Sequence, residues 1–494
     1  MKVNVAGREV DTRHFIDGQR ISSAETFPVH SAITEEVLGH ISRGDAETVN
    51  AAVDAAERAF PAWAALRPRG RLPYLERLAH IIEARVEDLA AVETLNNGSL
   101  LEASRLRVMR RGAHNIHFFA ELALEMGKSW DTEAVKNAVN NVQYDPAGVT
   151  ALITPWNAPF MLATWKVGPA LAAGNTVVLK PAEWTPFTAS LLADFALEAG
   201  LPPGVFNVVQ GLGGEAGAAL VAHPGVKRIS FTGSVPTAKK IASSAAANLT
   251  PVSFELGGKS PFIVFDDADF ELAMVNALDQ YDNCGQVCLS GTRLLVQDGI
   301  YDRFLEEFKR RAPRLKQGDP RDPATIVGPL VTRQHLERVH GFVQRAMAAG
   351  AKLEFGGKVS SDLGGLYYQP TLFSAVPEGA EILQAEVFGP VLTIQRFSSE
   401  EEAVRLANNT EYGLAAMLFT TNEARAERVA AQLVAGTVWI NCFYVRDLAA
   451  PFGGSRQSGV GREGGHWSFD FYCDVKNVMH RKGTFSASST SSSQ

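Results

Sequence analysis

Residues 148–180, GVTALITPWNAPFMLATWKVGPALAAGNTVVLK, contain two short apolar runs rich in β-branched residues, with a helical stretch between them. Two similar runs follow at 205–210 and 228–232. Alternation of such runs with helices is typical of βαβ units, so the sequence predicts a parallel sheet covered by helices. Ligands bind such sheets at the carboxyl ends of the strands, and the turns after these runs are therefore expected to carry the chemistry.

The chain on either side of this block extends the α/β pattern. Apolar residues at helical spacing predict consecutive helices over 45–85, and a second alternating block over 261–440 predicts a second α/β domain. Apolar and more polar residues alternate over 469–476, which predicts a late strand. The serine-rich residues 483–494 are expected to form a disordered tail.

Length and composition indicate a globular protein of about three domains, because 494 residues exceed what one core usually serves. A net charge of −7 argues against nucleic acid as a partner, which would need an excess of clustered Lys and Arg. Four cysteines are too few for a disulfide framework, and neither a secretory leader nor a bilayer-spanning stretch is recognisable. We expect a cytoplasmic protein without a membrane partner.

Cys288 lies in a segment of small and polar residues, 281–293, which suits a thiol that a substrate must reach. Glu255, 33 residues upstream, stands beside two glycines after a β-prone run. A thiol and a base are the minimum for covalent catalysis. A buried structural cysteine is the alternative. Cys284 and Cys288 without a nearby histidine lack the ligands of a structural zinc site, so no metal is expected, and Cys284 is expected to pack beside the thiol.

Seven short motifs occur in a fixed order along the chain. They are TPWN at 154–157, KPAE at 180–183, FTGS at 231–234, ELGGK at 255–259, GQVC at 285–288, EVFGP at 386–390 and PFGG at 451–454. The glycine-rich run at 211–217 is not a clean G-x-G-x-x-G and alone would be a poor sign of a dinucleotide site. Together the motifs resemble the NAD(P)-dependent aldehyde dehydrogenase superfamily over about residues 14–480.

This resemblance implies an α/β fold in three parts. A Rossmann-like NAD-binding domain would comprise residues 1–125 and 146–257, and a catalytic domain would comprise 258–440. A small β extension, 126–145 and 466–482, would serve oligomerisation, and a homodimer or homotetramer is expected.

The resemblance also gives the matched residues catalytic roles. Cys288 would be the nucleophile that attacks the aldehyde carbonyl, and Glu255 the general base for the thiol or the hydrolytic water. Asn157 would donate its side-chain amide to the oxyanion, together with the Cys288 backbone N–H. Lys166 would support the base through its charge. Hydride transfer to the nicotinamide would leave a thioester, which water hydrolyses to the acid.

The residues that would hold the cofactor lie at the strand ends and turns, and they are Thr154, Pro155, Trp156, Lys180, Glu183, Gly213, Phe231, Gly233, Ser234, Leu256, Glu386 and Phe388. Lys180 and Glu183 would bind the adenosine ribose, where a carboxylate repels a 2′-phosphate, so NAD is favoured over NADP. Glu386 would hold the nicotinamide ribose. Ala238 stands where members commonly carry a glycine, so packing beside the pyrophosphate is expected to differ slightly.

Three segments, 110–115, 164–169 and 441–448, resemble the branch of this superfamily that oxidises muconic semialdehydes in aromatic-ring meta-cleavage catabolism. The expected substrate is 5-carboxymethyl-2-hydroxymuconate semialdehyde, and Arg446 and Arg111 are expected to bind its carboxylate, because the arginine fork matches carboxylates. The 2-hydroxymuconate and 2-aminomuconate semialdehydes, broad aldehyde specificity, a coenzyme A-acylating reaction and a non-catalytic protein that retains the fold are the alternatives.

Overall fold

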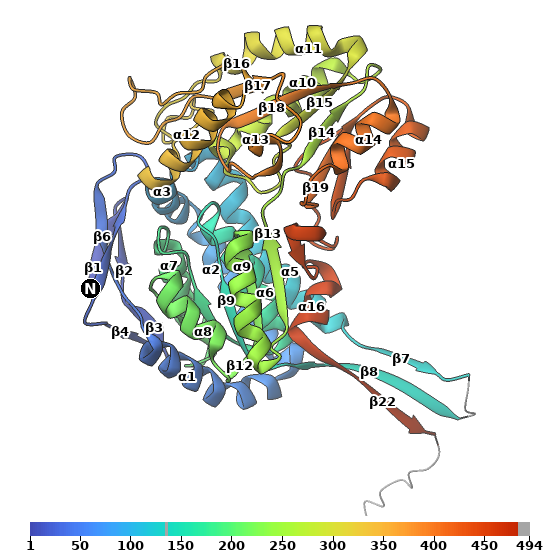
Figure 1. The fold of residues 1–494 in the computed structure, drawn as a ribbon. Coiled ribbons are helices and arrows are strands. Elements are labelled where there is room, and N and C mark those ends of the chain that lie inside the picture. Colours follow the sequence, from blue (N-terminus) through green and yellow to red (C-terminus); the bar gives the residue numbers. More distant parts are fainter. Residues whose placement is uncertain (134–136, 483–494) are drawn as a thin grey trace, which may run out of the picture.

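The structure is a computed structural model that describes residues 1–133 and 137–482. The predicted tail at 483–494 lies outside the described residues. Two α/β units make up the body, and a narrow three-stranded sheet projects from it (Figure 1).

The first sheet has eight strands in the order β21-β13-β12-β9-β10-β11-β3-β4. Its five central strands run parallel and are β9 (Val149–Ile153), β10 (Thr176–Lys180), β11 (Phe206–Val208), β12 (Val226–Gly233) and β13 (Val252–Leu256). Antiparallel strands form the edges, namely β3 (His14–Ile16), β4 (Gln19–Ile21) and β21 (Gly459–Val460). The four predicted strand runs and the parallel pairing are therefore confirmed.

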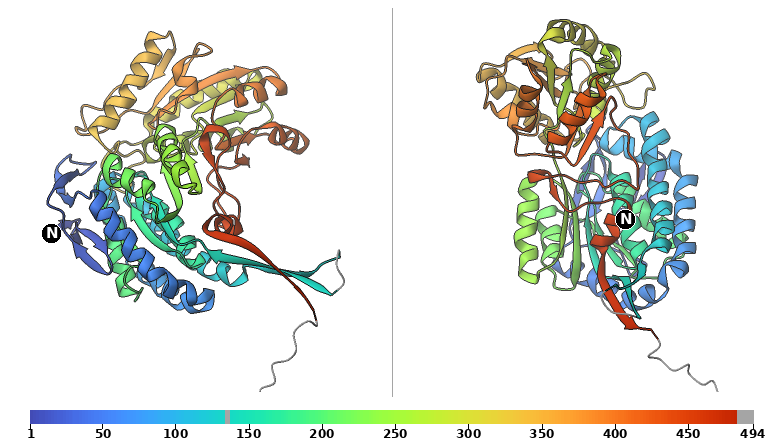
Figure 2. Two further views of the ribbon diagram at one scale, coloured as in Figure 1. Left: turned by 60° about the horizontal axis from the view of Figure 1, so that its bottom comes forward. Right: turned by 90° about the vertical axis from the view of Figure 1, so that its right-hand side faces the viewer.

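Neighbouring residues of these strands face opposite sides of the sheet, and each side has its own core. Val178 packs in one buried cluster with residues of α1, α8 and α9. Val177 and Leu179 pack in the other cluster with residues of α2, α5 and α6. Since strand side chains alternate between faces, a strand such as β10 that is buried at every position requires helices on both sides of the sheet (Figure 2).

The helices around this sheet are α1 (Ala46–Ala65), α2 (Arg67–Ala84), α3 (Val86–Asn97), α4 (Leu101–Ala103), α5 (Met109–Leu122), α6 (Pro159–Ala173), α7 (Phe187–Glu198), α8 (Ala218–Ala222) and α9 (Val235–Ala245). The consecutive helices predicted over 45–85 are confirmed. Helix α1 begins where the sequence indicates, because the Asp45 side chain caps it by accepting from the Thr48 backbone N–H at 2.9 Å.

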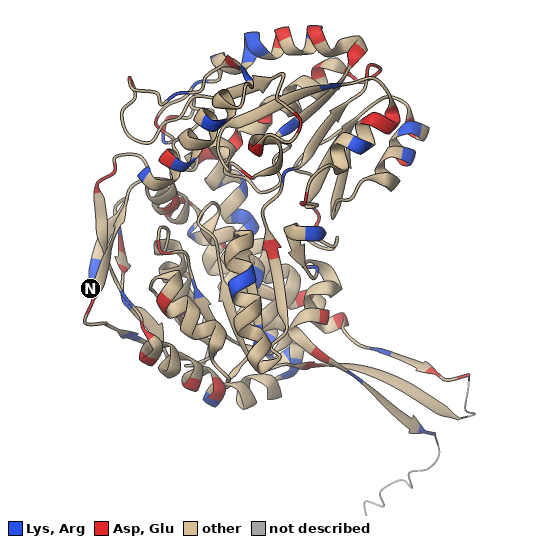
Figure 3. Ribbon diagram, in the orientation of Figure 1, with Lys and Arg blue, Asp and Glu red and all other residues tan. Residues whose placement is uncertain are grey.

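The second sheet has seven strands in the order β16-β17-β18-β15-β14-β19-β20, all parallel except β16. They are β14 (Pro261–Val264), β15 (Arg293–Gln297), β16 (Lys352–Phe355), β17 (Thr371–Ser374), β18 (Val391–Phe397), β19 (Ala415–Phe419) and β20 (Thr437–Ile440). Its helices are α10 (Phe270–Leu278), α11 (Asp298–Arg311), α12 (Arg333–Ala348), α13 (Glu381–Gln384), α14 (Glu400–Asn408) and α15 (Glu423–Gln432). The second α/β block is confirmed. Basic and acidic residues are interspersed along its helices (Figure 3).

The projecting arm pairs β7 (Lys128–Asp131), β8 (Ala138–Pro146) and β22 (Cys473–Arg481) in one antiparallel sheet. The strand predicted over 469–476 is wrong in its first half, because Gly465–Tyr472 form helix α16. Ser468, Phe469 and Tyr472 are buried there at helical spacing, and the strand begins only at Cys473. A short stretch with a few apolar residues fits both periods, and burial against the body selects the helix.

Two short hairpins complete the N-terminal region, formed by β1 (Lys2–Val5) with β2 (Arg8–Asp11) and by β5 (Thr26–His30) with β6 (Val37–Ser42). Within residues 1–133 and 137–482, no helix is both long and apolar enough to cross a bilayer.

Candidate active site

A cleft of about 1350 Å³ is lined by residues of both α/β units. Pockets for one small ligand usually measure about 300–1000 Å³, so this cleft has room for two ligands side by side. Cys288, Glu255 and Asn157 all line it, although they come from segments far apart in the sequence. The turns after β9, β10, β12 and β13 lie along it, as the parallel sheet predicts.

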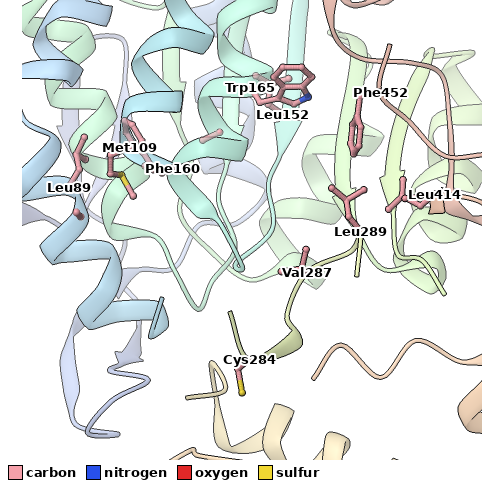
Figure 4. Close-up of a cluster of buried hydrophobic side chains, with 14 of the residues drawn as sticks. Leu89, Met109, Leu152, Phe160, Trp165, Cys284, Val287, Leu289, Leu414 and Phe452 are labelled. Carbon is pink, nitrogen blue, oxygen red and sulfur yellow. The ribbon is translucent and has the colours of Figure 1, made fainter. Parts of the chain in front are cut away.

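Cys288 follows the short helical segment η5 (Asp279–Gly285), whose last three residues adopt left-handed backbone conformations. Only glycine fits at 285, because a Cβ there would lie 2.2 Å from the Gly389 carbonyl oxygen. Val287 and Leu289, on either side of Cys288, belong to the buried cluster drawn in Figure 4. Cys284 is fully buried in the same cluster, as expected of a packed neighbour. The loop thus holds the thiol firmly at the cleft.

The Cys288 thiol is held in its neutral form. Burial is the main cause that raises its pKa to about 12, and the carboxylates of Glu386 and Glu255 raise it further. The positive charge of Arg446 acts in the opposite direction. A thiol in this setting needs a base or an added positive charge before it becomes a thiolate.

Glu255 lies on β13, paired with Thr232 of β12 and Gly459 of β21. Its side chain is buried, and neither carboxylate oxygen has a hydrogen-bond partner among the described residues. Burial is the main cause that raises its pKa well above the usual value, and the charge of Glu463 adds to it. Such a carboxyl group holds its proton readily and is a strong base once it has lost it.

Lys166 does not line the cleft but lies fully buried in α6. Its ammonium group donates to Glu463 Oε1 at 2.7 Å and to Ser230 Oγ at 2.8 Å. The Trp165 indole N–H donates to the other oxygen of Glu463 at 2.5 Å. Glu463 was missed by sequence reasoning, because a single carboxylate in a glycine-rich segment about 300 residues from its partners carries no local signal.

Asn157 lies in the turn after β9, and its side chain reaches the nucleophile loop. Its Nδ2 donates to the Gln286 carbonyl oxygen at 2.9 Å. In return, the Asn283 Nδ2 donates to the Asn157 carbonyl oxygen at 3.1 Å. The turn and the loop are therefore joined by two hydrogen bonds, with Asn157 at the edge of the cleft beside the Cys288 segment.

All twelve residues predicted to hold the cofactor line the cleft. Lys180 ends β10, and its buried ammonium group donates to Glu183 Oε2 at 3.1 Å. Glu183 itself is partly exposed to the cleft. Ser234 precedes α9, and Ala238 is buried within that helix, so a methyl group fills the position where a glycine is common.

Glu386 and Phe388 are the two predicted cofactor residues that come from the second α/β unit. Glu386 Oε1 accepts the Gly258 backbone N–H at 3.0 Å, and burial raises the pKa of this carboxyl to about 7. Phe388 contacts the Trp156 ring edge-on at a centroid distance of 5.2 Å. His335, which sequence reasoning missed, contacts Trp156 at 5.1 Å and hydrogen-bonds the Phe388 carbonyl oxygen.

Arg446 and Arg111 line the cleft near Cys288, and neither forms an ion pair with a carboxylate of the described residues. The Arg446 guanidinium lies 3.6 Å from the Phe452 ring centroid. The Arg111 Nε donates to Asn115 Oδ1 at 3.2 Å. Burial, reinforced by the charge of Arg446, lowers the Arg111 pKa to about 10. Two partly buried cations without an ion-paired carboxylate can attract an anionic group.

Comparisons with known proteins agree with this geometry. The chain is 42% identical to the 2-hydroxymuconic semialdehyde dehydrogenase of Pseudomonas sp. (strain CF600), with 95% of this chain and 99% of that protein aligned. It is 43% identical to the betaine aldehyde dehydrogenase of Cereibacter sphaeroides (strain KD131 / KCTC 12085), with 96% and 98% aligned.

A similar solved structure is the betaine aldehyde dehydrogenase (betB) of Staphylococcus aureus in complex with NAD⁺. Its TM-score is 0.93 at 37% identity, with 98% of this chain and 97% of that chain covered. Residues 20–478 match the model of the aldehyde dehydrogenase family. Since this match spans nearly the whole chain, the protein belongs to the aldehyde dehydrogenase family.

Proposed function

We propose that this enzyme oxidises a semialdehyde that carries a remote carboxylate, with 5-carboxymethyl-2-hydroxymuconate semialdehyde as the preferred substrate and NAD as the cofactor. The observation that carries the proposal is the pair Arg111 and Arg446, which lines the cleft near Cys288 without a carboxylate partner among the described residues. The similarity to a 2-hydroxymuconic semialdehyde dehydrogenase supports it.

The residues of the cleft fit NAD. The carboxylate of Glu183, held by buried Lys180, suits the hydroxyl groups of the adenosine ribose and disfavours the 2′-phosphate of NADP. A Cβ at Gly257 would lie 2.0 Å from Glu386 Oε2, so glycine preserves the space in which Glu386 meets the cleft and the nicotinamide ribose. When bound, NAD supplies the acceptor for the two electrons removed from the aldehyde.

The remaining chemistry belongs to the chain. Cys288 Sγ attacks the carbonyl carbon, and the second N–H of the Asn157 amide and the Cys288 backbone N–H stabilise the oxyanion. Glu255 accepts the proton of the thiol, or that of the water which cleaves the thioester, through oxygens that have no other partner among the described residues. The positive charge of Lys166 lowers the Glu255 pKa, whereas the negative charge of its partner Glu463 raises that pKa by a larger amount.

The two arginines also discriminate against other aldehydes. Betaine aldehyde carries a quaternary ammonium group, which Arg111 and Arg446 would repel. Arg107, exposed in the segment η1 (Ser104–Val108), lines the same cleft and is available to a second carboxylate. The 2-hydroxymuconate and 2-aminomuconate semialdehydes remain the closest competing substrates, since they too carry a carboxylate. Glu255 beside the thiol favours water over coenzyme A as the acceptor of the acyl group.

Replacing Arg446 by alanine tests the substrate. Hydrogen bonds to charged groups contribute roughly 1.5–3 kcal/mol, so the KM of the carboxylate-bearing semialdehyde should rise about ten- to hundredfold. The charge of Arg446 also lowers the Cys288 pKa, so kcat should fall for every aldehyde, whereas the effect on KM should be confined to carboxylate substrates. Steady-state kinetics with the semialdehyde and with an aliphatic aldehyde separate the two effects.

Two further variants serve as controls. Arg446→Met keeps most of the packing against Phe452 and should show the same change in KM. Arg105→Ala removes an arginine that pairs with Glu102 at the surface and should leave KM unaltered. An unchanged KM in Arg446→Ala would remove Arg446 from the substrate site.

The projecting arm is proposed to pack against a second copy of the chain in a homodimer or homotetramer. Trp130, Val475 and Met479 of the arm are each about half exposed, an apolar surface that association would bury. The double variant Trp130→Asp and Met479→Asp should yield the 53.3 kDa monomer by light scattering, whereas Val37→Asp, at an exposed residue of β6, should not. A monomeric wild type, or a variant of unchanged mass, would refute this role.

A cytoplasmic location is part of the proposal. It is supported by the four cysteines, all of which are free thiols.

A further inference from the structure

The backbone before Cys288 is held in a conformation that most residues avoid. Asn283 has φ 49° and ψ 34°, and Cys284 has φ 56° and ψ 35°. Asparagine and glycine enter this left-handed region most readily, and two successive non-glycine residues there persist only when the surroundings fix them. Because this strained backbone lies close to the reactive Cys288, the contacts of Asn283 bear on how the site is held.

Hydrogen bonds hold both backbone polar groups of Asn283. Its backbone N–H donates to Asp282 Oδ1 at 2.9 Å. Its carbonyl oxygen accepts from the backbone N–H of Gln286 at 3.1 Å and from Gln286 Nε2 at 2.9 Å. Gln286 is fixed in turn, because its Oε1 accepts the Val331 N–H at 3.0 Å. The side-chain amide of Asn283 is therefore presented from a rigid loop.

That amide reaches the other α/β unit. Asn283 Nδ2 donates to the Asn157 carbonyl oxygen at 3.1 Å, and Asn157 Nδ2 donates to the Gln286 carbonyl oxygen at 2.9 Å. The two bonds run in opposite directions and close a ring between the turn after β9 and the nucleophile loop. A single bond would leave the Asn157 turn free to shift, whereas the ring fixes its backbone and its side chain together.

We propose that Asn283 is a positioning residue that sets the direction of the Asn157 amide toward the oxyanion formed at Cys288. One N–H of that amide is committed to Gln286, two residues before the thiol, so the ring decides where its second N–H points. A misplacement of about 1 Å costs on the order of 10²-fold in rate. The inference rests on the proposed roles of Cys288 and Asn157.

The test compares two reactions of the Cys288 thiol in the full-length protein. Acylation by 4-nitrophenyl acetate develops an oxyanion, whereas alkylation by iodoacetamide does not, and both adducts are followed by intact mass. Asn283→Gly keeps the left-handed backbone but removes the amide donor. Its acylation should slow about ten- to hundredfold while its alkylation rate stays at the wild-type value.

A double-mutant cycle shows whether Asn283 acts through Asn157. In the Asn157→Ala background, Asn283→Gly should cause no further loss of acylation, because the donor that it positions is gone. Equal losses in both backgrounds would overturn the proposal. If Asn283→Gly does not fold, Asn283→Asp keeps the size and the left-handed tolerance without a donor. Its carboxylate also repels the oxyanion, so the same cycle with Asn157→Ala is used: a loss of acylation relative to alkylation that disappears in that background supports the positioning role, and an equal loss in both backgrounds overturns it.

The remaining outcomes separate this inference from the function on which it rests. If the wild type is acylated at Cys288 and the Asn283→Gly variant is acylated equally fast, only the positioning role is overturned. Equal loss of acylation and alkylation would show a general collapse of the loop and would also overturn it. A wild type that is not acylated at Cys288 would overturn the proposed function and this inference together.

Discussion

Replacing Cys288 by alanine is expected to lower kcat for aldehyde oxidation by at least about 10⁴-fold, because the proposed reaction proceeds entirely through a bond to this sulfur and loss of a nucleophile commonly costs this much. The cleft should remain intact, since Cys288 is only partly buried and its neighbours Val287 and Leu289 hold the loop in the core. NADH formation at saturating cofactor and substrate measures the loss.

Cys442→Ala is the matched control. Cys442 is also a partly buried free thiol, but it lies in the segment after β20 and should be replaceable without loss of activity. Binding of NAD to Cys288→Ala, measured by calorimetry, should match that of the wild type. Activity in Cys288→Ala within tenfold of the wild type would exclude the sulfur as the nucleophile.

Replacing Glu255 by glutamine is expected to lower steady-state turnover by about 10²- to 10⁴-fold, the usual contribution of a positioned base. Because hydrolysis of the thioester needs that base, an acyl adduct should accumulate on Cys288 and be visible by intact mass. Hydroxylamine, a nucleophile that needs no base, should cleave the adduct and restore turnover. Full turnover without hydroxylamine would assign the base to another group.

The raised pKa of Glu255 predicts how this effect depends on pH. Only the deprotonated carboxylate accepts a proton, so wild-type thioester hydrolysis should accelerate as the pH rises through the raised pKa, and Glu255→Gln should lack that rise.

The free energy of unfolding should fall as the pH rises, whereas the rate of thioester hydrolysis should increase. In the unfolded chain a glutamate titrates near about 4.3, so the native state binds the proton more tightly. This difference in pKa stabilises the folded state. The stabilisation is fully present below the pKa of the unfolded chain and is lost as the pH rises through the raised pKa of the native state. Glu255→Gln should therefore melt above the wild type at alkaline pH. A lower melting temperature there would show that Glu255 is stabilised in its charged form.

The parts of the fold that could be predicted are those with a local pattern. The strands around 148–233 are buried at most positions because both faces of the sheet are covered, and their turns carry polar side chains that the parallel topology gathers at one edge. The alternation over 469–476 predicts a strand, but its first four residues end the helix α16, because so short a pattern fits either period and packing against the body determines which residues are buried.

The parts of the site that could not be predicted are those made by contacts between distant segments. Glu463 and Ser230 meet Lys166 from two other parts of the chain, and His335 reaches Trp156 from the second α/β unit. The ring between Asn157 and Asn283 requires a left-handed backbone that no spacing reveals. The contacts of His335 and Asn283 depend on how the two α/β units pack, and the contact of Glu463 depends on the return of the C-terminal segment to the first sheet through β21. A linear pattern encodes neither.

The most direct test of the proposed function is NADH formation by the purified protein with NAD and each of three aldehydes. They are 5-carboxymethyl-2-hydroxymuconate semialdehyde, 2-hydroxymuconate semialdehyde and an aliphatic aldehyde that lacks a carboxylate. We predict that kcat/KM is highest for the first semialdehyde and at least about tenfold lower for the aliphatic aldehyde, which forms no bond to Arg446 or Arg111. Equal or faster turnover of the aliphatic aldehyde would contradict the arginine site and the substrate assigned to it.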